Sequence, residues 1–266
     1  MTNVQVAFLL TLLAGLSTGI GSLIALYARH TSKRLLAGSL GFSAGVMIYI
    51  SMVELLPHAQ THMARLGSAA GWAAAGCFFG GIVFTGLIDA LVPEAENPHE
   101  ARPVEAMARS SPGPRDRKLL RMGLFSAGAI AIHNFPEGLA TMVSYLANPV
   151  AGVSIAVAIA LHNIPEGISI SVPIFYSTGS RRKAFLYSFL SGLAEPLGAA
   201  VGFIILRPFL DEAVMGMVSA LAAGIMVYIS FDELLPAAHE YGEHHVAVYS
   251  LVGGMAVMAA SLLALG

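Results

Sequence analysis

Apolar residues occur along this chain in long runs, and short polar segments separate the runs. A helix that crosses a bilayer needs about 20 mainly apolar residues. Runs of this length predict helices over residues 6–28, 35–57, 69–91, 119–147, 149–175, 183–206, 213–236 and 246–265. The pattern therefore predicts an all-α integral membrane protein with eight transmembrane helices.

The overall composition also indicates a membrane protein. Of the 266 residues, 56% are hydrophobic and 11% are charged, whereas soluble domains carry roughly 25% charged residues. The formal net charge of −2 provides no positive field that would attract nucleic acid. Because the chain has a single cysteine, Cys77, it cannot form an intrachain disulfide.

One connection between the predicted helices is long. Residues 92–118 hold five prolines and much of the charge, and a segment of this kind cannot bury a core, so we expect a flexible cytoplasmic loop. The loop follows the first three helices, in residues 1–91. The rest of the chain divides into helices 4 and 5, in residues 119–175, and helices 6 to 8, in residues 183–266.

The basic residues predict how the chain lies in the membrane. All but two of the 14 Lys and Arg residues fall in or beside the loops that follow predicted helices 1, 3 and 5. The exceptions, Arg65 and Arg207, fall on the opposite side. Because loops rich in Lys and Arg stay in the cytoplasm, both termini are expected outside.

An internal repeat relates the two ends of the chain. Residues 44–59 read AGVMIYISMVELLPHA and residues 223–238 read AGIMVYISFDELLPAA, with 11 of 16 positions identical. The copies belong to predicted helices 2 and 7, so they run in opposite directions through the bilayer. Inverted repeats of this kind build carriers with a site near the midplane. We therefore expect a 3+2+3 arrangement in which helices 1–3 repeat as helices 6–8.

A second repeated motif lies in predicted helices 4 and 5. Residues 131–140 read AIHNFPEGLA and residues 160–169 read ALHNIPEGIS. Within each copy the His and the Glu are four residues apart and share one helix face, with the Asn on a neighbouring face. Antiparallel packing is expected to gather six side chains at mid-depth, those of His133, Asn134, Glu137, His162, Asn163 and Glu166. Glu195, in predicted helix 6, adds a third carboxylate.

These carboxylates require positive charge, because charged groups inside a bilayer are costly without a partner. Apart from Arg121 and Lys183 at their ends, these spans contain no Lys or Arg, and imidazole with carboxylate suits divalent ions such as Zn²⁺, Fe²⁺ and Mn²⁺. Two carboxylates can bridge two such ions. A single intramembrane His or Asn more often forms an interhelical hydrogen bond, but two copies on adjacent helices favour a metal site.

The ends of predicted helices 2 and 7 carry further candidate ligands. Glu54 and His58 lie near the outer end of helix 2, and Glu233 and His239 lie near the inner end of helix 7. They are candidates for metal sites at the entrance and the exit of a pathway. Because polar side chains at helix ends are commonly just solvated, both interpretations stay open.

The paired HNFPEG and HNIPEG motifs, together with GLAEPLGA at residues 192–199, resemble the ZIP (Zrt/Irt-like) metal transporters, and most closely a bacterial branch of that family. The resemblance covers nearly the whole chain except residues 92–118. It implies that the protein imports zinc, and also iron, manganese, cobalt and cadmium, across the bacterial inner (plasma) membrane. These metals are substrates, and no separate cofactor is implied.

The resemblance also implies a binuclear site and alternating access. One ion would be held by His133, Glu137, His162 and Glu166, and the other by Asn134, Glu137, Asn163, Glu166 and Glu195. The expected partners are metal ions and the lipid bilayer. Glycine-rich faces on predicted helices 2, 3 and 8 also permit a homodimer.

Three kinds of function fit a metal site in the membrane: a carrier, a channel and an intramembrane metal-dependent hydrolase. A metal with His and Glu ligands can activate water, but the chain has no HExxH motif. Strong ligation holds ions too tightly for fast conduction through a channel. Two inverted halves suit a carrier, so the sequence predicts a transporter, not an enzyme, with the hydrolase as the alternative.

Overall fold

The computed structural model describes residues 1–27, 33–90, 117–209, 211–240 and 244–265. Most of the predicted loop 92–118 lies outside these residues. The described part is almost entirely helical and contains no strand, with α-helices α1 (Asn3–Tyr27), α2 (Lys33–Ile50), α3 (Leu56–His62), α4 (Ala70–Ala90), α6 (Arg117–Ala147), α7 (Pro149–Thr178), α8 (Arg181–Gly192), α9 (Ala194–Leu206), α10 (Glu212–Ile229), α11 (Leu235–Glu240) and α12 (His244–Leu265).

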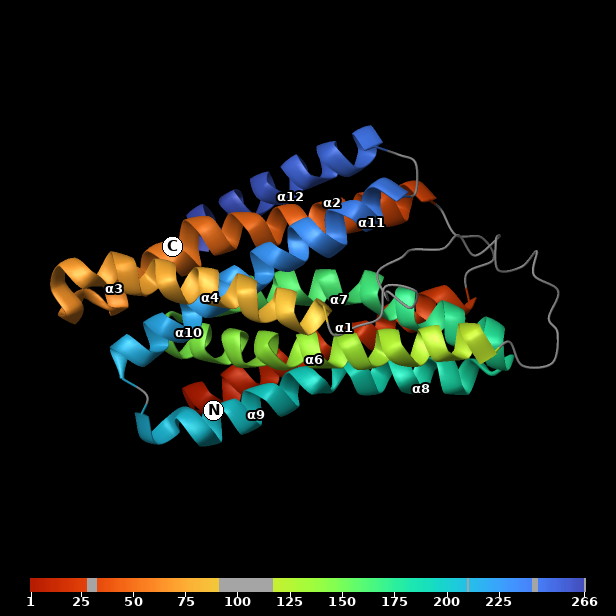
Figure 1. Ribbon diagram of the computed structural model, residues 1–266, viewed down its shortest axis with the longest axis horizontal. Coiled ribbons are helices and arrows are strands. Elements are labelled where there is room, and N and C mark those ends of the chain that lie inside the picture. The colour runs from red at the N-terminus through yellow and green to blue at the C-terminus, as the bar shows by residue number, and fades with distance from the viewer. Residues whose placement is uncertain (28–32, 91–116, 210, 241–243, 266) are drawn as a thin grey trace.

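The helices form an elongated bundle (Figure 1), and both termini lie toward the same end of it. Among the described residues, seven helical stretches are long and apolar enough to cross a membrane. In addition, α6 has 31 residues, which is about 46 Å of helix at 1.5 Å per residue. With α6 included, helices occupy all eight of the predicted ranges, and their ends differ from the predicted ones by only a few residues, apart from the longer second helix.

Three of these stretches are interrupted helices. A π-helical turn, Ser51–Leu55, joins α2 to α3, and a second, Ser230–Leu234, joins α10 to α11. Each is followed by a proline, Pro57 or Pro236. The proline ring clashes with the carbonyl four residues before it in a regular α-helix, and the wider π turn relieves this conflict. The third interruption, at Leu193, separates α8 from α9 three residues before Pro196.

A tight turn places the two HNxPEG helices side by side. Asn148 caps α7 by accepting hydrogen bonds from the backbone N–H groups of Val150 and Ala151, at 3.0 and 3.4 Å, and Pro149 occupies the first helical position. Because Asn148 alone separates α6 from α7, the two helices must run antiparallel. They pack against each other and run unbroken through Pro136 and Pro165.

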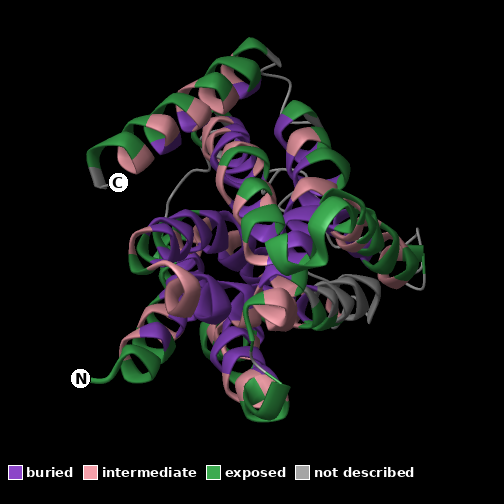
Figure 2. Ribbon diagram, turned by 90° about the vertical axis from the view of Figure 1, so that its left-hand side faces the viewer, coloured by how far each residue is buried: buried purple, intermediate pink, exposed green. Residues whose placement is uncertain are grey.

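Among the described spans, those of α1, α2, α7 and α10 are the most deeply buried, each with half or more of its residues inside the bundle. Helix α1 packs mainly on α7, α2 on α12, α4 on α10, and α6 on α7 and α9. Buried positions face the middle of the bundle and exposed positions face outward (Figure 2). Helices α4 and α12 lie at the edge, where less than a quarter of each span is buried. Their exposed residues are large and apolar, among them Trp72 and Leu263, as expected for surfaces that face lipid.

Candidate metal centre

The described Asn, His and Glu side chains of the HNxPEG motifs point into the protein, not toward lipid. Six of the seven predicted ligand side chains are described and all six are buried, with exposed fractions from 0% to 6%: Asn134, Glu137, His162, Asn163, Glu166 and Glu195. His133 lies in α6 between Ile132 and Asn134, but its side chain is not among the described ones. Its role as a ligand therefore stays a prediction.

His162 lies between the carboxylates of the two motif helices. Its Nε2 atom is 2.9 Å from Oε1 of Glu166, one turn further along α7, and 3.9 Å from Oε1 of Glu137 on α6. The sequence contains no Lys or Arg between Arg121 and Arg181. The imidazole and the two carboxylates thus form a buried cluster. Neither α6 nor α7 carries a Lys or Arg beyond Arg121, near the start of α6.

The two motif asparagines bind matching backbone groups on the flanking helices. Asn163 Nδ2 donates to the carbonyl of Ala14 on α1 at 2.9 Å, and Asn134 Nδ2 donates to the carbonyl of Ser191 on α8 at 3.4 Å. Asn163 Nδ2 also donates to the carboxylate of Glu195 on α9. These hydrogen bonds fix both amide groups and bring Glu195 to the motif helices.

The hydrogen bonds made by the amide nitrogens leave oxygens directed into the interior. Among the described residues, no donor reaches Oδ1 of Asn134, Oδ1 of Asn163 or Oε2 of Glu195, although all three atoms are buried. Buried acceptors without a partner are rare and costly. Hard oxygen acceptors next to an imidazole and carboxylates form a donor set that fits a divalent cation.

The described side chains of this cluster do not form a closed metal cage. No three His, Cys, Asp or Glu side chains in the described part of the chain form a group that could hold a metal ion as they stand. The potential ligands come instead from α6, α7 and α9, with α1 and α8 supplying backbone acceptors. Small movements of these helices would therefore change the distances between the ligands.

Glycines allow the flanking helices to approach closely. A methyl group on Gly138 would overlap the carbonyl of Glu195, and one on Gly167 would overlap the carbonyl of Thr18. Each glycine directly follows the Glu of its motif. The contacts bring the backbones of α9 and α1 directly against the two motif helices.

The candidate exit residue Glu233 lies close to this cluster, whereas the candidate entrance residue Glu54 does not enter it. Glu233, in the second π turn, is 6% exposed and interacts electrostatically with Glu166 and His162. Glu54, in the first π turn, contacts His58 at 3.4 Å, with 17% of the Glu54 side chain and 46% of the His58 side chain exposed. His239 is exposed at the end of α11.

Sequence reasoning missed the partners that α1 contributes. Residues 15–21 read GLSTGIG and residues 192–198 read GLAEPLG, so α1 and the α8–α9 pair match at an offset of 177 residues. The two asparagine acceptors, Ala14 and Ser191, obey the same offset. Thr18 takes the place of Glu195 in this alignment, and its buried hydroxyl has no hydrogen-bond partner among the described residues. This weak repeat is the sequence signal from which the contribution of α1 could have been predicted.

Another polar group lies beside Glu233. The hydroxyl of Tyr228 on α10 is 3.4 Å from Oδ2 of Asp89 on α4 and interacts also with Asp232. Gly86 lies one turn before Asp89, and a methyl group there would be 3.2 Å from the Tyr228 ring. Gly86 and Asp89 are three residues apart, and Tyr228 and Asp232 are four apart. Each pair therefore lies on one helix face.

Known proteins resemble this chain over its whole length. A family model described as ZIP Zinc transporter matches residues 93–262. The protein called zinc transporter ZupT from Chlorobium luteolum is 58% identical, with 100% of both chains covered. Those from Streptococcus mutans and Clostridium perfringens are 56% and 55% identical, with 97% and 99% of this chain and 96% and 97% of theirs covered. The chain therefore belongs to the ZIP zinc transporter family.

Proposed function

We propose that this protein carries zinc into the cytoplasm across the bacterial inner membrane. The observation that carries the proposal is the pair of HNxPEG motifs on two antiparallel helices, of which the described ligand side chains, those of Asn134, Glu137, His162, Asn163 and Glu166, lie buried together. Relatives that match the whole chain are named zinc transporters. Membership of the ZIP family favours a transporter over the metal-dependent hydrolase.

The proposed substrate site holds two ions bridged by carboxylates. One ion is bound by His133, Glu137, His162 and Glu166. The other is bound by the set Asn134, Glu137, Asn163, Glu166 and Glu195. Support comes from the buried acceptor oxygens without hydrogen bonds in the described residues and from the short distances around His162. Iron, manganese, cobalt and cadmium are proposed as further substrates, because the same nitrogen and oxygen ligands bind them.

Alternating access through a 3+2+3 inverted repeat is the proposed mechanism. The contact of α1 with α7 has its counterpart in that of α6 with α9, and the contact of α2 with α12 in that of α4 with α10. The glycine contacts follow the same rule: Gly45 lies against the carbonyl of Leu251, and its repeat partner Gly224 against that of Phe78. Exchange between two related packings would open the site to one face and then to the other.

We further propose that the ion approaches past Glu54 and His58 and leaves past Glu233 and His239. The inward position of the exit pair rests on the distribution of Lys and Arg, which places both termini outside. The electrostatic interaction of Glu233 with Glu166 and His162 supports a step between the central site and the exit.

Uptake into proteoliposomes that contain a zinc-sensitive dye tests this function. Wild-type protein is expected to give saturable zinc entry, and replacement of His133 and Glu137 by Ala is expected to abolish it. Glu212→Gln is the matched control, because Glu212 is an exposed carboxylate paired with Arg65. Entry that rises linearly with zinc concentration would indicate a channel. Tight zinc binding without entry would contradict the carrier.

A further inference from the structure

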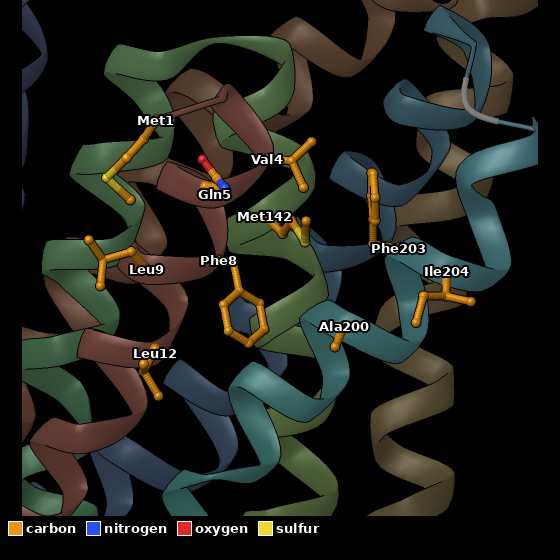
Figure 3. Close-up of a pocket in the computed structure, with 10 residues that line it drawn as sticks. All are labelled: Met1, Val4, Gln5, Phe8, Leu9, Leu12, Met142, Ala200, Phe203 and Ile204. Carbon is orange, nitrogen blue, oxygen red and sulfur yellow. The ribbon is translucent and has the colours of Figure 1, made fainter.

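An apolar groove opens on the side of the bundle at its N-terminal end. It has a volume of about 470 Å³ and lies between the first half of α1 and the second half of α9, with Met142 of α6 at its floor. Figure 3 shows the lining side chains, with Phe8 of α1 and Phe203 of α9 on the two sides. Because this surface belongs to membrane-spanning helices, the groove faces the hydrocarbon region of the bilayer.

The single polar side chain that lines the groove is held by its own helix end. Gln5 Oε1 accepts a hydrogen bond from the backbone N–H of Thr2 at 2.9 Å, and the Thr2 hydroxyl accepts one from the N–H of Gln5 at 3.3 Å. This reciprocal pair is a capping box. The amide oxygen is thus used at the start of α1, and the rest of the groove lining is apolar.

A cation lies where the groove reaches the membrane surface. Arg207 follows Phe203 and Ile204 by four and three residues, so it lies one turn beyond them on the same side of the helix. It is exposed and forms no ion pair with another described side chain. By contrast Arg65, the other basic residue expected at this face of the membrane, is paired with Glu212 at 3.5 Å.

The equivalent place at the other end of the bundle is closed by the protein itself. With the offset of 177 residues, the counterpart of the groove lies between the start of α8 and the end of α1. There the Arg181 guanidinium lies 5.1 Å from the ring centre of Tyr27 and 5.9 Å from that of Phe175. Leu26, the counterpart of Phe203, is only 6% exposed. In the described residues the two places thus differ, because contacts within the chain cover this one and the groove stays open.

We propose that the groove binds one phospholipid molecule, with an acyl chain between α1 and α9 and the phosphate on Arg207. The apolar lining matches an acyl chain, and a guanidinium binds a phosphate oxygen pair through two parallel N–H groups. The depth agrees with this placement, because the cation lies at the helix end and the apolar surface lies toward the bilayer centre. This lipid site is separate from the metal centre.

Photolabelling of the full chain in phosphatidylcholine nanodiscs tests the proposal. A small fraction of phosphatidylglycerol carries a photoreactive acyl chain, and labelled peptides are mapped by mass spectrometry. Labelling of the α1 and α9 segments is expected to exceed that of the exposed α4 face around Trp72 and Phe79 several-fold. Arg207→Gln is expected to remove this excess, and Arg65→Gln, the matched control, to retain it. Ala200→Trp, which fills the groove, is expected to abolish it.

Three outcomes would overturn the lipid site. The first is equal labelling of the groove and the α4 face, which means annular lipid only. The second is equal labelling by a photoreactive diacylglycerol that lacks the phosphate. The third is the same effect of Arg207→Gln and Arg65→Gln. Arg207 is exposed, so its replacement is not expected to prevent folding, and the test stands even if the Ala200→Trp variant fails to fold.

Discussion

Asn163 donates a hydrogen bond from its side-chain nitrogen to the carboxylate of Glu195, and this bond joins α7 to α9 in the interior. The same nitrogen donates to the carbonyl of Ala14 at 2.9 Å. With both N–H groups used, the amide oxygen must point the other way, where no described donor meets it. The arrangement therefore directs the amide oxygen, a metal ligand, into the interior. The N–H groups, which would repel a cation, stay in their hydrogen bonds.

Replacing Glu195 by Gln is expected to weaken zinc binding while the fold persists. The Gln oxygen can still accept the hydrogen bond from Asn163, but the negative charge is lost. Removal of groups that only orient metal ligands already costs about 10–100-fold in affinity, so a loss of at least about tenfold is expected. Equilibrium dialysis of purified protein against zinc measures it, with Glu212→Gln as the control. Equal affinities would exclude Glu195 from the site.

Glu166→Gln tests the bridging carboxylate. In the wild type, Nε2 of His162 lies 2.9 Å from the Glu166 oxygen. Gln keeps a hydrogen-bonding group at this place, but it has no negative charge to balance the charge of a bound ion. Most of the zinc uptake into proteoliposomes is expected to disappear. Thermal unfolding of the same sample separates a lost site from a lost fold. Uptake equal to that of the wild type would show that this carboxylate does not bridge ions.

Acid is expected to slow uptake. Zinc binds the neutral imidazole and the carboxylate form of its ligands, so protons and metal compete for the same atoms. The initial rate at a fixed, subsaturating zinc concentration should fall as the pH is lowered on both sides of the vesicle, and saturating zinc should restore much of it. A rate that rises in acid would instead indicate coupling of transport to protons.

The helices could be predicted because lipid imposes a simple rule on the sequence. Each span must be mainly apolar along its length, so the limits of α1 and α7 follow closely from the composition alone. The burial of Asn134 and His162 was predictable for a related reason, because a polar group on a membrane helix must face the interior.

Other features depend on contacts that leave little trace in the sequence. The acceptors for Asn163 and Asn134 are backbone carbonyls, and a carbonyl has no residue signature. Glu54 and Glu233 are repeat partners, yet of the two only Glu233 is buried, although each π turn packs against both α2 and α10. The turns themselves had a sequence signal, the proline three residues after each Glu, but its effect on the helix was not predicted.

Gly138 and Gly128 on α6 offer a matched pair for testing the close helix contacts. A methyl group on Gly138 would overlap the carbonyl of Glu195, whereas one on Gly128 would meet nothing within 4 Å. Overpacking of this kind typically costs about 1–3 kcal/mol. Gly128→Ala removes a weak helix former and is expected to leave stability equal or improved by up to about 1 kcal/mol.

The unfolding temperatures of the two variants in detergent give the comparison. Gly138→Ala is expected to unfold at a lower temperature than the wild type and to lose zinc uptake, because α9 must move away and take Glu195 with it. Gly128→Ala is expected to retain both properties. If the two variants behave alike, the close approach of α9 to α6 is not what holds Glu195 at the centre, and the hydrogen bond from Asn163 must do so alone.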